Sequence, residues 1–278
     1  MAFAPLRPRI TVPPTKVAAD TYVIHSVQEA LGQPLFIYLN SMVILGREPM
    51  IVDTGTIANR EQWLEDVFSL VQPEDVRWVF ISHDDVDHTG NLEQAMEACP
   101  NARLVCNWAM VERHTNCFDF PLERCQWVMD GETLDIGDRT LVALRPPVYD
   151  SPTTRGLFDP TTGVYWSVDT FATPLLDPAM GVGDLETEFW QFGMSLFALG
   201  AVSPWLSLVD PAKYATYVER VQSLDITTIA GCHTPVIEGA LIEQAFAHVR
   251  ALPTTPPPPM PDHSVLEEII AASAVPQG

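Results

Sequence analysis

Residues 76–88 read VRWVFISHDDVDH, so an apolar run passes directly into a run of histidine and aspartate. The apolar segment Val76–Ser82 is typical of a strand that is buried on both faces. Two histidines and three aspartates then follow within six residues. Clustered carboxylates repel one another and are costly to bury unless a cation neutralises them. Because loops after the strands of α/β sheets often carry functional groups, the segment predicts a metal site rather than a solvated acidic turn.

The rest of the sequence alternates predicted strands with predicted helices, which is typical of an α/β fold. Three predicted strands end at or just before further polar residues. Met50–Val52 is followed by Asp53, Val164–Asp169 ends in Asp169, and Ile226–Gly231 is followed by Cys232 and His233. We therefore expect these side chains to lie near the ends of their strands.

Three segments have the signals of helices. Apolar residues fall at helical spacing from Asn59 to Leu70. Asp210 is a natural N-cap for a helix that has Pro211 in its first turn. The last helix of the main domain is predicted over Glu238–Ala251.

His83–His88 resembles the HxHxDH motif of the metallo-β-lactamase superfamily, and more closely the HxExDH variant of flavodiiron proteins and stand-alone oxygen-binding diiron proteins. Asp53 in IVDTG, Asp169 in YWSVDTF and His233 in AGCHTP resemble the other landmarks of that superfamily. The resemblance covers most of residues 20–250. It implies a fold of the α/β class, the metallo-β-lactamase αββα sandwich.

The resemblance also implies how the chain is divided. We expect a metallo-β-lactamase-like domain over residues 1–251 and a Pro-rich linker and C-terminal tail over residues 252–278. Pro253–Pro261 is expected to be extended, and Ser264–Ala274 has the pattern of a short amphipathic helix. Two interpretations of this tail are open. It is either an arm that packs on its own domain or on a neighbouring molecule, or a disordered end.

By resemblance, the ligands form two half-sites. One metal ion would be held by Asp87, His88 and His233. The other would be held in part by His83 and Asp85. The carboxylate of Asp169 would bridge the two ions.

One expected ligand is absent from the sequence. The resembled families have a further histidine about 60 residues after the motif, where Arg145–Pro152 reads RPPVYDSP. Tyr149 and Asp150 are the candidates for a substitute oxygen ligand; a first half-site that is open or only weakly filled is the alternative. Asp87 and Tyr149 are the candidate catalytic residues.

The donor types bear on the identity of the metal. Asp85 offers a hard anionic oxygen where hydrolytic members have histidine, and oxygen-rich shells suit iron or manganese better than zinc. We expect two iron ions, with zinc, manganese or a single metal as alternatives.

Three functions are compatible with these residues. The resemblance favours a non-haem diiron oxidoreductase of the flavodiiron type that binds or reduces a small diatomic, oxygen or nitric oxide. We expect no flavodoxin domain after residue 278, so electrons would come from a separate flavoprotein or rubredoxin-like protein; without such a partner the protein would act as an oxygen sensor. The alternatives are a metal-dependent hydrolase of an ester, lactone or thioester, in which Asp87 binds metal and orients a metal-bound hydroxide, and a non-catalytic descendant.

Charge and composition narrow the partners. The formal net charge of −21 repels phosphate backbones and anionic lipids, so we expect neither nucleic-acid nor membrane binding. The N-terminus has no apolar core of signal-peptide length. Five cysteines, an odd number without a CxxC pair, favour a reduced cytoplasmic protein with thiols that are mostly small buried side chains. The aromatic-rich segment 170–208 is a candidate lid, substrate wall or homodimer face.

Overall fold

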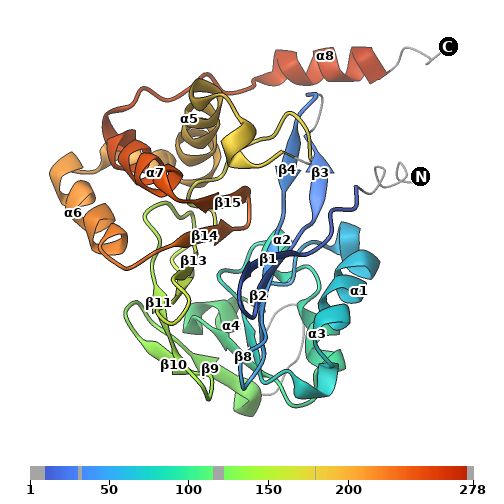
Figure 1. Ribbon diagram of the computed structural model, residues 1–278. Helices are drawn as coiled ribbons and strands as arrows, with labels where there is room; N and C mark the ends of the chain where they lie inside the picture. The colour runs from blue at the N-terminus through green and yellow to red at the C-terminus, as the bar shows by residue number, and fades with distance from the viewer. Residues whose placement is uncertain (1–9, 31–32, 115–121, 179, 274–278) are drawn as a thin grey trace.

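Two β-sheets packed face to face form the centre of the computed structural model, which describes residues 10–30, 33–114, 122–178 and 180–273 (Figure 1). The first sheet contains, in spatial order, β1 (Thr15–Ala18), β2 (Thr21–Ile24), β5 (Ser41–Ile44), β6 (Met50–Val52), β7 (Trp78–Phe80), β8 (Arg103–Cys106) and β9 (Cys125–Trp127). The second contains β10 (Thr133–Asp135), β11 (Thr140–Leu144), β12 (Gly156–Asp159), β13 (Val164–Trp166), β14 (Thr228–Gly231) and β15 (Thr234–Glu238). A separate hairpin is formed by β3 (Val27–Glu29) and β4 (Phe36–Tyr38).

Helices cover the outer face of each sheet (Figure 1). Those beside the first sheet are α1 (Arg60–Leu70), α3 (Leu92–Ala98) and α4 (Trp108–His114), and the short α2 (Val86–Thr89) follows β7. Those beside the second sheet are α5 (Thr187–Ser195), the π-helix η5 (Leu196–Val202), α6 (Pro211–Gln222) and α7 (Ala240–Ala251).

The alternation of side chains along the strands explains the layering. In β5, Met42 and Ile44 pack into the core between the two sheets, together with Trp166 of β13. Val43, which points to the opposite face, packs with Trp63 of α1. A third core lies between the second sheet and helices α5 to α7. Since each sheet is apolar on both faces, four layers form, and the predicted α/β αββα sandwich is confirmed.

The predicted helix at Asn59–Leu70 is confirmed as α1, and the predicted cap of α6 is confirmed in detail. The Asp210 carboxylate accepts hydrogen bonds from the backbone N–H groups of Ala212 and Lys213, at 2.9 and 3.1 Å. The prediction for Glu238 was wrong, because this residue ends strand β15 and α7 begins at Ala240. Strand β15 pairs with β14 at the edge of the sheet, where a proline such as Pro235 is tolerated.

Beyond α7, the 3₁₀ turn η7 (Leu252–Thr254) leads into a segment without regular structure and then into α8 (His263–Ser273). Helix α8 extends away from the sheets in Figure 1. The expected helix Ser264–Ala274 is therefore present, although Ala274 itself lies outside the described residues. The division of the chain at residue 251 stays a prediction. Among the described helices, none is long and apolar enough to cross a membrane.

The cysteines behave largely as expected. Cys99, Cys106 and Cys232 are buried, and Cys125 is half-buried. Cys117 lies outside the described residues.

Candidate metal centre

The predicted metal-binding residues gather where strands of both sheets end. Asp53 follows β6 and the His83–His88 segment follows β7, and these two strands are parallel. Asp169 follows β13 and His233 follows β14, which are also parallel. Because the carboxyl ends of parallel strands meet at one edge of a sheet, both sheets deliver polar side chains to the same region.

All seven predicted metal ligands line one cavity of about 250 Å³. They are His83, Asp85, Asp87, His88, Asp150, Asp169 and His233. The remaining wall is apolar and comes from η5, through Phe197, Ala201 and Val202. Prediction from the sequence missed these three residues individually, although it singled out the aromatic-rich segment that contains them.

The two oxygens of the Asp169 carboxylate face different groups of donors. Oδ1 lies 3.3 Å from Nε2 of His88 and 3.4 Å from Nε2 of His233. Oδ2 lies 3.6 Å from Nε2 of His83. A carboxylate placed in this way is suited to join two cation sites, since each oxygen is directed at a separate set of ligands.

The side chains around these oxygens complete the two groups. Asp87 Oδ2 lies 3.2 Å from Nε2 of His233 and 3.7 Å from Nε2 of His88. On the other side, His83 Nε2 lies 3.7 Å from both Asp85 Oδ2 and Asp150 Oδ1. Donors that bond one ion at about 2.1 Å lie roughly 3.0 to 3.4 Å apart, so the observed spacings are close to those of a metal shell.

Asp53 fixes the orientation of the His88 ring. Its Oδ2 accepts a hydrogen bond from His88 Nδ1 at 2.9 Å and one from Trp166 Nε1 at 3.0 Å. Both carboxylate oxygens also accept from Ser82, one from the backbone N–H and one from the hydroxyl. With Nδ1 engaged, the other ring nitrogen of His88 is left to face the cavity, as in protein metal sites.

His233 is oriented in the same way by a backbone group. Its Nδ1 donates to the carbonyl oxygen of Tyr38 at 2.7 Å, so Nε2 points to Asp87 and Asp169. The Phe197 ring stacks beside the imidazole with ring centroids 6.0 Å apart. The apolar wall therefore lies directly against one of the predicted ligands.

Two buried atoms in the cavity have no hydrogen-bond partner among the described residues. They are Nε2 of His88 and Oδ1 of Asp169, which face each other across 3.3 Å. A buried polar group without a partner costs free energy, on the order of 1–3 kcal/mol. A bound cation would satisfy both atoms, so the residues present fit a metal ion.

The electrostatics of the cavity favour ionised carboxylates. Burial raises the pKa of Asp169, but the facing histidines outweigh it and lower that pKa to about 2. Burial lowers the pKa of His233, whereas Cys232, Asp87 and Asp169 raise it well above its usual range. The Asp169 carboxylate therefore stays ionised at neutral pH, and it offers the negative charge that a bound metal cation requires.

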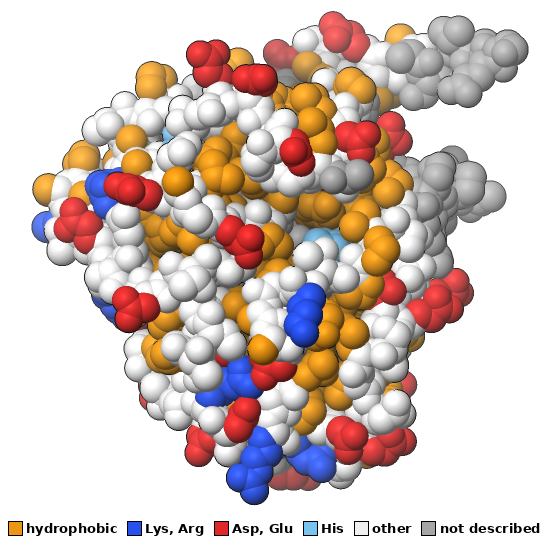
Figure 2. Space-filling view, in the orientation of Figure 1, with side chains coloured by type: hydrophobic (Ala, Val, Ile, Leu, Met, Phe, Trp, Pro, Cys, Tyr) orange, Lys and Arg blue, Asp and Glu red, His pale blue; other side chains and the backbone are white. Residues whose placement is uncertain are grey.

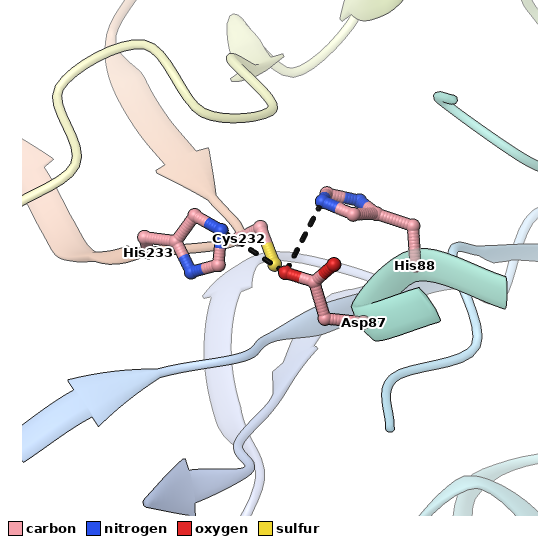
Figure 3. Close-up of side chains that lie close together, drawn as sticks. All are labelled: Asp87, His88, Cys232 and His233. Carbon is pink, nitrogen blue, oxygen red and sulfur yellow. Dashed lines mark ion pairs between the residues drawn. The ribbon is translucent and has the colours of Figure 1, made fainter. Parts of the chain in front are cut away.

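Cys232 adds a sulfur to the group that Asp87 belongs to (Figure 3). In Figure 3, His88 comes from α2, while Cys232 and His233 come from the end of β14 on the opposite side of the Asp87 carboxylate. The cysteine is fully buried, and its sulfur lies within 4.8 Å of donor atoms of Asp87, His88 and His233. Its place next to His233 in the sequence was the only signal for it.

The structure does not bring Tyr149 into the metal cavity. Its ring lines a different pocket and lies 4.9 Å from the Trp205 ring, whereas the adjacent Asp150 lines the cavity. Asp84 also lies apart: its carboxylate accepts from Thr153 Oγ1 at 2.7 Å and from Arg113 at 2.6 Å. Asp84 thereby ties the motif to the loop that carries Asp150.

His25 is a buried histidine whose two ring nitrogens both have partners outside the metal cavity. Its ring nitrogens contact Asn40 Oδ1 at 3.0 Å and Thr15 Oγ1 at 2.8 Å. The backbone next to two site residues has positive φ, +58° at Asp53 and +57° at Val168. Aspartate tolerates this conformation, whereas it is rare for a β-branched residue such as Val168, and such strain concentrates at functional sites.

Comparison with known proteins gives a family and a fold. A family model described as "ODP family beta lactamase" matches residues 37–234. A diflavin flavoprotein A 1 from Synechocystis sp. is 26% identical over 203 residues, which are 71% of this chain and 34% of the relative. An anaerobic nitric oxide reductase flavorubredoxin from Pectobacterium atrosepticum is 23% identical over 172 residues, which are 61% of this chain and 34% of the relative. The chain thus spans about a third of the length of the curated relatives it matches.

Solved structures share the architecture. The flavodiiron protein from Giardia intestinalis superposes with a TM-score of 0.72 over 88% of this chain and 60% of that one, at 19% sequence identity. Similarity at this level of identity concerns the fold, the αββα sandwich with its strand ends gathered at one edge.

Proposed function

We propose, from the premise that the chain belongs to the ODP family of β-lactamase-fold proteins, that its cavity holds two iron ions and binds or reduces a small diatomic, oxygen or nitric oxide. The observation that carries this proposal is the Asp169 carboxylate, one oxygen of which lies near His88 and His233 and the other near His83. A single ion would not require both groups.

The residues that would hold the ions follow from these groups. Asp87, His88 and His233 form one set, and His83, Asp85 and Asp150 form the other, with Asp169 between them. When bound, a pair of iron ions supplies electrons and open coordination positions to a small ligand. The carboxylate donors at positions 85 and 150 favour iron over zinc in the second set.

The chain's own residues prepare the cavity for a small apolar molecule. Asp53 and the Tyr38 carbonyl hold two imidazoles in place, which leaves their Nε2 atoms directed inward. The wall formed by Phe197, Ala201 and Val202 is apolar, and the cavity of about 250 Å³ is small. Oxygen and nitric oxide are small and weakly polar, so they fit such a wall better than a large polar substrate does.

The names of the relatives support the same chemistry and suggest partners. One relative is named an anaerobic nitric oxide reductase flavorubredoxin, and a similar structure is described as a rubredoxin oxygen:oxidoreductase from Desulfovibrio gigas. We include in the proposal a separate electron-donor protein and pairing of two copies of the chain. If no electron-donor protein takes part, we propose that the protein acts as an oxygen sensor.

Anaerobic loading of the metal-free protein with ferrous iron tests the proposal. We expect an absorption band that develops when air or nitric oxide is admitted to the wild-type protein. His88→Ala and His233→Ala should lose the band, whereas His263→Ala, which changes an exposed histidine in α8, should keep it. An iron-loaded wild-type protein that responds to neither gas would contradict the proposal.

A zinc-dependent hydrolase is the second candidate, and Cys232 is the observation that favours it. Thiolates are soft donors that suit zinc, and the set Asp87, His88, Cys232 and His233 contains one. In this case Asp87 would also orient a metal-bound water. Turnover of an aryl ester or thioester by the zinc-loaded protein, lost in Asp87→Ala, would support it; a rate equal to that of the metal-free protein would exclude it.

A further inference from the structure

A second pocket, larger than the metal cavity, lies between α6, the loop that follows β11 and the 3₁₀ helix η6 (Pro204–Leu208). Its volume is about 440 Å³, within the range of small-molecule sites. It is lined mainly by aromatic and cationic side chains, among them Arg145, Tyr149, Trp205, Lys213, Tyr214 and Tyr217. None of these residues belongs to the metal cavity.

The aromatic rings in this pocket are held in fixed positions. Tyr149 and Trp205 lie with ring centroids 4.9 Å apart, and Trp205 Nε1 donates to the Tyr149 carbonyl at 3.1 Å. The Tyr217 hydroxyl donates to the carbonyl of Arg145 at 2.6 Å. Rings that are positioned before a ligand arrives lose little conformational entropy when a planar molecule stacks on them.

The charge of the pocket is the reverse of the charge of the chain. Red acidic side chains are spread over the face shown in Figure 2, while blue basic ones are few. The sequence has only two lysines, Lys16 and Lys213, and the second lines this pocket together with Arg145. Among the described residues, no carboxylate lies within ion-pair distance of either Arg145 or Lys213.

A third cation strengthens the positive field from behind. Arg155 is 1% exposed, and within the described part of the chain its guanidinium donates hydrogen bonds only to the carbonyl groups of Pro152 and Thr154. Burial, and then repulsion from Arg145, lower the pKa of Arg155. Asp210 is the one acidic residue in the lining, and its carboxylate is engaged by the backbone N–H groups at the start of α6.

Two polar atoms in the pocket wall are buried and have no hydrogen-bond partner in the part of the chain that the structure describes. They are the hydroxyl oxygen of Tyr214, whose side chain is only 7% exposed, and Nε of Arg145. Unpartnered groups of this kind are uncommon in native structures. Both are donors, so a ligand that brings an acceptor would satisfy them.

We propose that this pocket binds a planar aromatic anion, with its ring against Tyr149, Trp205 and Tyr217 and its carboxylate or phosphate toward Arg145 and Lys213. Aromatic faces recognise a flat ring, and guanidinium and ammonium groups recognise the anionic group. The proposal is independent of the metal and of the function proposed above, because no predicted metal ligand lines the pocket.

The pocket shares a wall with the metal cavity. Ser203 Oγ accepts from the Tyr149 N–H at 2.9 Å and donates to the Tyr149 carbonyl at 2.7 Å. The neighbouring residues Asp150 and Val202 line the metal cavity. The segments that carry Tyr149 and Ser203 therefore contribute to the walls of both cavities.

Isothermal titration calorimetry with 2-naphthoate tests the proposal on the full chain. We expect saturable binding of one molecule per chain, and binding at least tenfold weaker for the neutral 2-naphthamide. Lys213→Met, Arg145→Gln and Trp205→Leu should each weaken 2-naphthoate binding about tenfold or more, since each removes a charge-assisted or stacking contact. Lys16→Met, which changes the other lysine, is the matched control and should bind as the wild type does.

Several outcomes would overturn the proposal. They are absence of saturable 2-naphthoate binding, equal affinity for the amide, and wild-type affinity in Lys213→Met and Arg145→Gln. The melting temperature of each variant shows whether it is folded; if Trp205→Leu unfolds, the variants of exposed Lys213 and half-buried Arg145 decide.

Discussion

At the scale of single residues, each candidate imidazole ligand depends on what its other nitrogen contacts. His88 is held by Asp53, which is itself fully buried and accepts from Ser82 and Trp166. The sequence placed Asp53 at a strand end but gave no sign that it reaches a ring 35 residues away. Such contacts arise only when β6 and β7 lie side by side, so sequence spacing cannot reveal them.

Asp53→Asn tests this positioning. Asparagine has one acceptor oxygen, so it cannot accept from His88, Ser82 and Trp166 as the carboxylate does. We expect metal affinity to fall about 10- to 100-fold and stability to fall by about 1–3 kcal/mol. Chelator competition and denaturant unfolding measure the two effects. Asp225→Asn, which changes an exposed aspartate, is the control and should alter neither.

Asp150 and Tyr149 were both candidates for the missing ligand, with Asp150 among the predicted metal ligands, and the two line different cavities. Asp150 lines the cavity, with Oδ1 3.7 Å from His83 Nε2, whereas Tyr149 faces the second pocket. We expect Asp150→Ala to lower the affinity for one of two ions at least tenfold, since it removes a charged donor. Tyr149→Phe should leave metal binding unchanged. Equal metal titrations for both variants would show that this loop supplies no ligand.

At the scale of elements, the sequence predicted best where one segment carries its own signal. The VFIS strand, the HDDVDH loop, α1 and the cap of α6 all depend on local pattern, and all are present. No strand was predicted at β15, and its last residue Glu238 was assigned to the following helix, because the pairing of β15 with β14 is a tertiary contact. Local sequence also left positions 149 and 150 both open, because the cavity that each side chain faces depends on tertiary contacts such as those of Tyr149 with Ser203 and Trp205.

The role of the π-helix η5 as a wall of the metal cavity could not be predicted from the sequence either, because it also depends on tertiary contacts. Its Phe197 closes a cavity whose other residues lie in distant segments, and only the fold brings them together. Turns of π-helix are rare and are often found at functional sites.

Phe197→Ala tests the role of this wall. The Phe197 ring stacks beside His233, so its removal should open the cavity to water and to chelators. We expect a chelator to withdraw metal several-fold faster, with metal stoichiometry at saturation unchanged. Stopped-flow mixing with a coloured chelator gives the rate, and Phe192→Ala, an exposed aromatic in α5, serves as the control. An unchanged rate would mean that η5 does not limit access.

At the scale of the whole molecule, the candidate site joins the two sheets. Asp53 and the HDDVDH segment follow strands of the first sheet, whereas Trp166, Asp169 and His233 belong to the second. The Trp166–Asp53 hydrogen bond crosses between them. The fold class was predictable because each half has its own motif, but the contact between the halves was not.

The proposed boundary after residue 251 predicts that α8 is dispensable. Leu266 and Ile270 of this helix are 43% and 59% exposed, and the helix extends away from the sheets (Figure 1). We expect truncation after Asp262 to change the stability by less than about 1 kcal/mol, which is a shift in Tm of less than about 4 °C. Differential scanning calorimetry measures it. A much larger loss would mean that the tail is part of the domain.

The most direct test of a two-ion site bridged by Asp169 is the metal stoichiometry of protein purified without air, by elemental analysis together with native mass spectrometry. We expect about two irons per chain in the wild type and fewer in Asp169→Asn, whose amide nitrogen cannot serve as the second bridging donor. The proposal of a diiron centre would be contradicted by one metal ion per chain at saturation, or by zinc as the only bound metal after expression in iron-supplemented medium.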